Sequence, residues 1–327
     1  MKTAEINTRA YTYLNSIEED FDLKNDKNYL FDLDFLSVLS LNGDKSLEFL
    51  QGQLTCDLRE LSDIKMVQGA QCNLKGRILS LLDIIQWNGI KLILPHDLLE
   101  LTQSSLAKTA LLSRVKIEHV AQMKIFGFYL QNKSDLLPEV AFLPETDRGQ
   151  SYDLNTCYYH LGNGFYIFVM NSDYAAKFSA SFIERNQLVG SYSWHAHRLA
   201  EKQFSIYPES RGLFLPHRLD LQETDIISFD KGCYKGQEII ARTQYRATLK
   251  HDLGLYLVNT SPQIASGKKL FKLTDGNELG EIIDYAEVSA DKTLIALSAL
   301  KEPFDSALFV EGGEPVSITK YTLETCD

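Results

Sequence analysis

The stretch FDKGCYKGQEIIAR, residues 229–242, is the most unusual part of this 327-residue sequence. Gly232 and Gly236 bracket a cysteine, a tyrosine and a lysine, and the residues after Gly236 have the composition of a helix with Glu238 in its first turn. The neighbouring lysines and the helix N-terminus favour the thiolate form of Cys233, which makes this residue a candidate nucleophile at neutral pH. The alternative is a structural thiol buried in a tight glycine-rich turn, and the local sequence leaves both interpretations open.

The charge of this region contrasts with that of the whole chain. The chain has 33 Lys and Arg residues against 44 Asp and Glu residues, a net charge of −11. Such a surface repels phosphate backbones, so no broad nucleic-acid binding is expected. Between residues 231 and 250 the only acid is Glu238, whereas five side chains are basic: Lys231, Lys235, Arg242, Arg246 and Lys250. This local excess predicts either an anionic partner or an interface that is salt-bridged to the acidic remainder.

Composition and cysteine usage indicate a cytoplasmic globular protein. Hydrophobic residues make up 44% of the chain and charged residues 24%, which is ordinary for two or three globular domains. The first residues lack the apolar core of a signal peptide, and no apolar run reaches the length of a membrane span. The cysteines form no CxxC pair, which predicts reduced thiols, all structural apart from Cys233, and no metal site. They are Cys56, Cys72, Cys157, Cys233 and Cys326.

Apolar periodicity and turn residues predict a mixed α+β chain that ends in an all-β part. Residues 1–28 are polar and predict a loose lead-in, whereas the apolar run 29–41 predicts one buried strand. Asn88-Gly89 between two apolar runs predicts a hairpin, because both residues tolerate positive φ. From about residue 249, short strands separated by glycine turns predict a small separate β-barrel. Helices are expected near residues 96–112, 172–186 and 191–203.

The 229–242 stretch resembles the signature of the YgfZ family, K-G-C-Y-x-G-Q-E followed by a short apolar stretch and A-R. Every fixed position is present: Lys231, Gly232, Cys233, Tyr234, Gly236, Gln237, Glu238, Ala241 and Arg242. Three further segments resemble blocks of the same family: LNGDKSLEFLQGQLTCDL (41–58), GAQCNLKGRIL (69–79) and the stretch from 194 to 222. With gaps, the resemblance covers residues 29–250.

The resemblance implies the α+β fold of the related glycine-cleavage aminomethyltransferase, or T-protein, with interleaved domains around a central cavity and a C-terminal β-barrel. The implied divisions are a polar lead-in (1–28), a folate-binding α+β domain (29–117 with 191–247), a second α+β domain (118–190) and the barrel (248–327). Family members bind tetrahydrofolate or a derivative. They support the maturation or repair of iron–sulfur enzymes, including tRNA-modifying ones. The implied partners are therefore folate and, indirectly, those enzymes.

The resemblance places Trp194, Leu36, Arg198, Lys75 and Arg77 at the folate site. Trp194 matches a family tryptophan whose indole face offers stacking area to a pterin, although it could be a core aromatic. Arg198, four residues on, shares the helix face of Trp194 and is a ligand contact or a salt-bridge partner. Leu36 stands where some members have tryptophan and can supply only apolar contact. Lys75 and Arg77 flank a hairpin glycine. They either contact the carboxylates of the folate's glutamate tail or are solvated charges of the turn.

Two nearby histidines are interpreted as solvated or capping side chains. They are His195 and His197, and residues two apart on a helix face different directions, which makes a metal pair improbable.

The chain departs from the transferase at its catalytic acids. Ser80 and Leu81 stand where the transferase has two aspartates, one of which activates the folate nitrogen. Asp83 returns to the strand face of Leu81 and is either a shifted acid or a structural residue. We therefore expect a folate-binding accessory protein, with Cys233 partly exposed, serving redox or transfer chemistry, and with the signature segment lining or bordering the cavity.

Two other functions stay open at this stage. One is a folate-dependent one-carbon transferase or demethylase with rearranged acids. The other is an RNA-binding module that uses the basic stretch 231–250. The acidic overall charge and the lack of interleaved exposed aromatic residues count against RNA binding.

Overall fold

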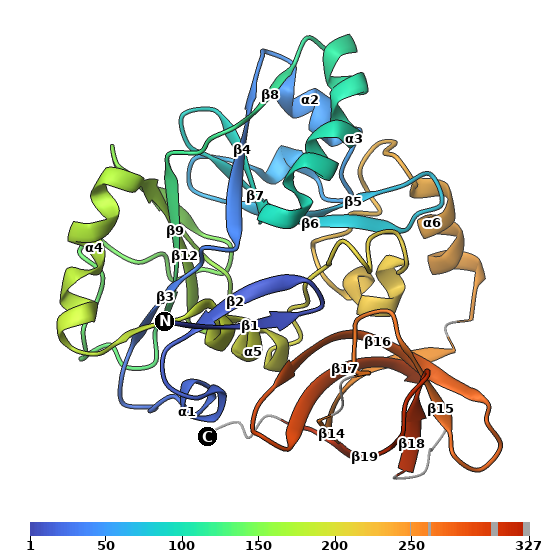
Figure 1. Ribbon diagram of the computed structural model, residues 1–327. Helices are drawn as coiled ribbons and strands as arrows, with labels where there is room; N and C mark the ends of the chain where they lie inside the picture. Colours follow the sequence, from blue (N-terminus) through green and yellow to red (C-terminus); the bar gives the residue numbers. More distant parts are fainter. Residues whose placement is uncertain (249, 261–262, 302–306, 323–327) are drawn as a thin grey trace.

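The described residues form two large open β-sheets with their helices, a two-stranded hairpin sheet and a closed barrel (Figure 1). The computed structural model describes residues 1–248, 250–260, 263–301 and 307–322. Mixed α and β content together with the closed barrel confirms the predicted fold class. No helix in this described part of the chain is long and apolar enough to cross a membrane.

The first sheet has five strands in the order β5-β6-β7-β4-β8. Its strands are β4 (Leu36–Asn42), β5 (Val67–Cys72), β6 (Ile78–Gln86), β7 (Ile90–Pro95) and β8 (Lys116–His119). The predicted turn between β6 and β7 is confirmed, because Asn88 and Gly89 both have positive φ and join antiparallel strands. Its helical segments are α2 (Ser46–Gln51), η1 (Leu58–Glu60), η2 (His96–Leu98) and α3 (Leu99–Leu112).

The second sheet has six strands in the order β10-β11-β12-β9-β3-β13. Its strands are β3 (Tyr29–Asp32), β9 (Met123–Tyr129), β10 (Gln150–Tyr152), β11 (Thr156–His160), β12 (Phe165–Asn171) and β13 (Leu188–Val189). Helix α4 (Ser172–Glu184) packs against it.

The single strand predicted over residues 29–41 is wrong. The chain forms β3 in the second sheet, turns at Leu33–Phe35, and continues as β4 in the first sheet. The apolar run is continuous because one core lies between the two sheets, and Phe31, Leu33 and Val38 all belong to it. A run of buried residues therefore does not reveal that the chain changes sheet.

The loose lead-in predicted for residues 1–28 is also wrong. This segment forms a hairpin of β1 (Lys2–Ile6) and β2 (Arg9–Tyr13), followed by helix α1 (Ile17–Phe21). Ile6 and Tyr11 are fully buried, and Arg9 is buried as an ion pair with Asp97. The apolar pattern is weak because only part of each short strand is buried and because one of its buried residues is charged.

The predicted C-terminal barrel closes in the order β14-β17-β16-β15-β18-β19. Its strands are β14 (His251–Asn259), β15 (Lys269–Lys272), β16 (Glu278–Glu287), β17 (Lys292–Leu300), β18 (Ala307–Val310) and β19 (Pro315–Lys320). The segment between the second sheet and the barrel holds α5 (Ser191–Ala200), η3 (Pro216–Leu219), η4 (Leu221–Glu223) and α6 (Gln237–Arg246). Helix α5 lies between the N-terminal hairpin and the barrel (Figure 1).

Candidate functional site

A central cavity of about 180 Å³ is lined by both sheets and by the segment that follows them. Strands β5, β6 and β7 of the first sheet line one part of the cavity, and Ile167 of β12 in the second sheet lines another part. Helix α5, residues 202–206 and residues 219–226 complete the lining. Segments distant in sequence therefore meet here, which is the arrangement expected of a ligand pocket.

Trp194 and Arg198 lie together in the cavity lining, on the shared face of α5 that their spacing predicts. Trp194 packs edge-on against Phe165, with ring centroids 5.4 Å apart. It can approach strand β9 because residue 127 is glycine: a Cβ there would lie 2.4 Å from the indole ring. The guanidinium of Arg198 lies 5.0 Å from the centroid of the Phe165 ring. The indole is thus held rigidly, with one side available to the cavity.

Arg198 is a buried cation for which no hydrogen bond or ion pair is found within the described ranges. Burial lowers the pKa of its guanidinium to about 10, an effect that the nearby Asp83 carboxylate opposes. A buried guanidinium with free donors suits an anionic or carbonyl-bearing ligand.

Asp83 also lies in the cavity lining, on the same face of β6 as Leu81. Its carboxylate accepts hydrogen bonds from Gln68 Nε2 at 2.7 Å and from the Tyr159 hydroxyl at 2.9 Å. Burial raises the pKa of Asp83, whereas these two donors and the charge of Arg198 act in the opposite direction. The structure thus brings an acid into the cavity even though Ser80 and Leu81 replace the transferase aspartates.

The other three predicted folate contacts divide between the cavity and the surface. Leu36, the first residue of β4, lines the cavity, and so does Phe35 at the end of the preceding turn, where the alternation of side chains along a strand does not apply. Lys75 and Arg77 are exposed at the tip of the β5–β6 hairpin and do not line the cavity. Arg77 Nη1 donates to the carbonyl of Leu213.

The prediction of solvated or capping histidines is wrong for both residues of α5. His195 is buried beside Asp284, with Nε2 3.4 Å from Oδ1, and contacts the carbonyl of Tyr285 at 3.2 Å. His197 stacks on Phe21 with ring centroids 5.2 Å apart, and burial lowers the pKa of its imidazole to about 4. Both are covered because α5 is packed on several sides, which its sequence alone does not show.

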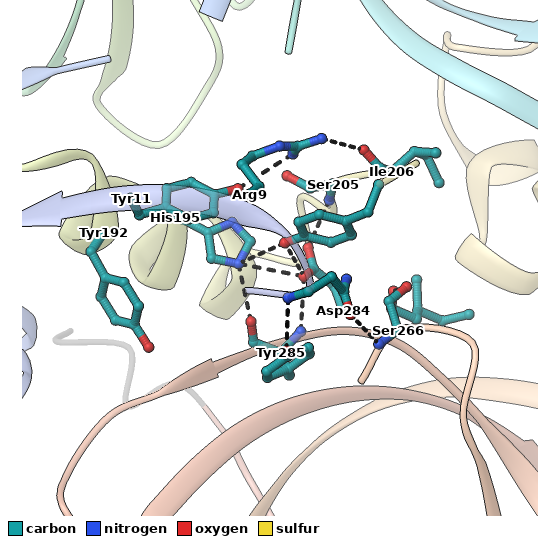
Figure 2. Close-up of polar contacts among 12 residues, drawn as sticks. Arg9, Tyr11, Tyr192, His195, Ser205, Ile206, Ser266, Asp284 and Tyr285 are labelled. Carbon is teal, nitrogen blue, oxygen red and sulfur yellow. Dashed lines mark hydrogen bonds and ion pairs between the residues drawn. The ribbon is translucent and has the colours of Figure 1, made fainter. Parts of the chain in front are cut away.

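A buried polar cluster fixes the wall of the cavity between α5 and the barrel (Figure 2). Asp284 of β16 accepts hydrogen bonds from the Tyr207 hydroxyl at 2.8 Å and from the backbone N–H of Ser205 at 2.7 Å. Arg9 of the N-terminal hairpin donates to the carbonyl of Ile206 at 2.7 Å. Ser205 and Ile206 themselves line the cavity.

This cluster escaped the sequence analysis because its members are far apart in the chain. Arg9, Tyr207 and Asp284 come from the hairpin, the connecting segment and the barrel. The signal that could have indicated it is an aspartate that interrupts the apolar stretch IIDYA of β16 (residues 282–286).

The signature segment is anchored at both ends and exposed at its centre. The Lys231 ammonium is buried and donates to the carbonyls of Leu54 at 2.8 Å and Cys56 at 2.5 Å, and burial lowers its pKa to about 8. On the other side Tyr234 is buried, and Gly236 has a φ of +89° with no room for a Cβ, which would lie 2.5 Å from the carbonyl oxygen of Asn73.

These anchors hold the short stretch between them at the surface, where Gly232 and Cys233 are exposed. Gln237 closes the turn, since its side-chain oxygen accepts from the backbone N–H of Tyr234 at 3.4 Å. Glu238 and Arg242 are exposed on α6, which begins at Gln237 as predicted.

Cys233 is exposed as predicted, whereas the other described thiols are buried. Burial raises the pKa of Cys56 and of Cys72 to about 12, and raises that of Cys157 further. These three fit the structural role expected of them, and Cys326 lies outside the described residues.

The signature segment itself does not line the cavity. The lining residues of this part of the chain end at Ile226. The anchoring of Lys231 on residues 54–56 leads the following residues to the surface instead. For the same reason Lys231 does not contribute to the exposed positive charge expected over residues 231–250.

The chain is similar to known proteins in both sequence and structure. It is 30% identical over 228 residues to tRNA-modifying protein YgfZ of Yersinia enterocolitica, covering 68% of this chain and 69% of the relative. It is 28% identical to the protein of the same name from Vibrio atlanticus, over 72% of each chain. The glycine cleavage system aminomethyltransferase T of Bartonella henselae superposes with a TM-score of 0.75, covering 98% of this chain and 93% of the other, at 14% identity. No protein-family model matches the chain.

Proposed function

Because the chain belongs to the family of tRNA-modifying protein YgfZ, we propose that it is a folate-binding accessory protein that holds a tetrahydrofolate in its central cavity. The observation that carries the proposal is the convergence of Trp194, Asp83 and Arg198 on one enclosed space. They supply an aromatic face, an acceptor and a cationic donor, which together suit a flat polar heterocycle.

The polar groups of the cavity fit a pterin. The Asp83 carboxylate keeps acceptor capacity beyond its bonds to Gln68 and Tyr159, and can accept from the amino and ring N–H groups of a pterin. The unpaired guanidinium of Arg198 can donate to the pterin carbonyl or to a carboxylate. A bound tetrahydrofolate supplies reduced ring nitrogens on which one-carbon units can be carried, and the chain's own residues orient and enclose it.

We propose further that the protein acts in the cytoplasm and supports the maturation or repair of iron–sulfur enzymes, among them enzymes that modify tRNA. Cys233 is the side chain that would act on such a client, because it is the only exposed thiol in the described ranges and the signature residues around it are rigidly anchored. Replacing Cys233 with Ala in cells that lack the protein should reduce rescue of iron–sulfur enzyme activity, and full rescue would show that the thiol is dispensable.

The folate proposal is tested by titrating tetrahydrofolate and following the fluorescence of Trp194. Trp87→Phe isolates this signal, since Trp87 is the other tryptophan and lies outside the cavity lining. Quenching should saturate at micromolar ligand, and Asp83→Asn or Arg198→Ala should weaken binding by about tenfold, as expected for the loss of one charge-assisted hydrogen bond.

Asp252→Asn provides the matched control, because this carboxylate is exposed on the barrel and forms a surface ion pair with Lys301 at 3.2 Å. Absence of quenching at high micromolar ligand, or equal binding by the Asp83 and Asp252 variants, would count against a folate in this cavity.

The position of Asp83 also favours a second candidate, a one-carbon transferase or demethylase. A carboxyl group with a raised pKa inside the cavity can hold or accept a proton next to a bound substrate. This candidate predicts that Asp83→Asn stops transfer from a methylene donor to tetrahydrofolate in single-turnover mixtures at saturating ligand. Absence of any transfer by the parent protein would exclude it.

A further inference from the structure

The outer face of α6 forms a cationic surface next to the signature segment. Helix α6 lies at the edge of the molecule, beside the tip of the β5–β6 hairpin (Figure 1). The two are in contact, because a Cβ on Gly76 would lie 3.1 Å from the side chain of Ile239. We use the name α6 face for three exposed residues of the helix and three lysines of the adjoining hairpin and flanking segments: Arg242, Tyr245 and Arg246, with Lys75, Lys235 and Lys250.

Among the described residues, the five cations of the α6 face have no ion-pair partner. Glu238 is the only acid between residues 235 and 250, and it forms no ion pair with Arg242 one helical turn away. Some cations elsewhere on the surface are paired with carboxylates, as Lys65 is with Glu60 and Lys269 is with Glu278. Unpaired like charges gathered on one surface indicate an anionic partner.

Tyr245 adds an aromatic platform beside the two arginines. It is 71% exposed, lies about one helical turn after Arg242 on the same side of α6, and precedes Arg246 in the chain. The ring stands edge-on against Phe229, with centroids 5.8 Å apart and planes at 69°. One side of the ring is therefore supported by the protein, while much of its surface is open to a stacking partner.

We propose that the α6 face binds single-stranded RNA. Guanidinium groups beside a supported, exposed aromatic ring match the backbone phosphates next to a stacked base. An acidic protein segment would use the cations but has no need of Tyr245. In the sequence analysis, the lack of exposed aromatic residues among the basic ones counted against RNA binding. The structure shows that Tyr245 is such an exposed aromatic residue.

The net charge of −11 does not prevent local binding of this kind. At physiological ionic strength charges are screened beyond about 8 Å, so an RNA segment on α6 interacts with the local cations rather than with distant carboxylates. The partner expected is accordingly a short unpaired segment, such as a loop or an end, rather than a long duplex. This inference does not depend on folate binding.

The test uses a fluorescein-labelled oligouridylate of about 12 nucleotides, a length typical of single-strand sites, and fluorescence anisotropy at several salt concentrations. Arg242→Ala with Arg246→Ala should weaken binding at least tenfold and reduce the slope of log affinity against log salt by about two. Tyr245→Ala should weaken binding by about tenfold, and Tyr245→Phe should retain it.

The matched control is the pair Lys108→Ala with Lys177→Ala, two exposed cations on α3 and α4 that change the net charge by the same amount. This pair should leave affinity and salt slope unchanged. Circular dichroism and urea midpoints confirm that each variant is folded.

Alkylation of Cys233 gives an independent readout, measured in a Cys326→Ser background. The thiol is exposed a few residues before α6 begins, so bound oligouridylate should slow its reaction with iodoacetamide. If polyglutamate binds as tightly as the oligouridylate, and if Tyr245→Ala leaves that binding unchanged, the proposal is overturned in favour of an acidic protein partner. Equal loss in the control pair, or no binding of the oligonucleotide at low salt, would overturn it outright.

Discussion

Replacing Asp284 with Asn should destabilise the whole protein, because this carboxylate joins the barrel to the cavity wall. Asp284 is fully buried and uses both oxygens: Oδ1 accepts from the Tyr207 hydroxyl and from the Tyr285 N–H, each at 2.8 Å, and Oδ2 accepts from the Ser205 N–H at 2.7 Å. An asparagine offers one acceptor oxygen in place of two, so its amide nitrogen must face at least one of these donors. One charge-assisted bond is then lost and a buried N–H or O–H is left without a partner.

These two losses together should lower the free energy of unfolding by about 3 kcal/mol. The measurement is urea unfolding at neutral pH with linear extrapolation. Asp252→Asn, the same change at an exposed site on the same barrel, should stay within about 0.5 kcal/mol of the parent. Tyr207→Phe, which removes one of the donors, should cost about 1 kcal/mol. If Asp284→Asn costs no more than Asp252→Asn, the carboxylate does not hold the barrel to the cavity wall and the reasoning fails.

Three further outcomes follow from the geometry. Gly236→Ala should lower the free energy of unfolding by about 2 kcal/mol, because φ is +89° and a Cβ would meet a backbone oxygen at 2.5 Å. The control in the same urea series is Gly232→Ala, where a Cβ would meet nothing within 4 Å. Burial lowers the pKa of His197 to about 4, so between pH 6.5 and 4 only the unfolded chain takes up this proton. The free energy of unfolding should therefore decrease as the pH is lowered through this window, by at most about 3 kcal/mol. His197→Phe should flatten the pH dependence of the urea midpoint, and an unchanged dependence would contradict the assignment. Iodoacetamide should modify Cys233 in the native protein and should modify the three buried cysteines only in urea. Peptide mass spectrometry measures the modification of each thiol. Modification of a buried thiol in the native protein at a rate similar to that of Cys233 would contradict its burial.

The features that the sequence predicted well are those fixed by local geometry. Trp194 and Arg198 share a helix face because four residues make about one helical turn. Asp83 and Leu81 share a strand face because side chains alternate with a period of two. The Asn88-Gly89 turn depends only on the φ values that its own residues tolerate. None of these inferences needs knowledge of the neighbouring elements.

What the sequence did not predict depends on contacts between distant segments. Burial of His195 results from the barrel strand that supplies Asp284, about ninety residues later in the chain. The change of sheet after Asp32 is invisible because both sheets bury apolar residues in one shared core. The burial of Lys231 was missed for a similar reason: a lysine is normally solvated, and the distant carbonyls of Leu54 and Cys56 make its burial tolerable.

One continuous segment, residues 219–236, belongs to both the cavity and the surface. Its first half lines the cavity up to Ile226, and its second half carries the exposed thiol of Cys233. Between them, the Ser228 N–H bonds to the carbonyl of Thr55, whose hydroxyl in turn donates to the carbonyl of Ile226 at 2.6 Å. A ligand that pressed on the wall at Ile226 would therefore act on a segment bonded to residues 52–56, the same stretch that anchors Lys231 and Lys235 on either side of Cys233. The rigid anchors imply that any such influence is transmitted as a displacement of the whole segment relative to residues 52–56, rather than by loosening of the thiol's own turn.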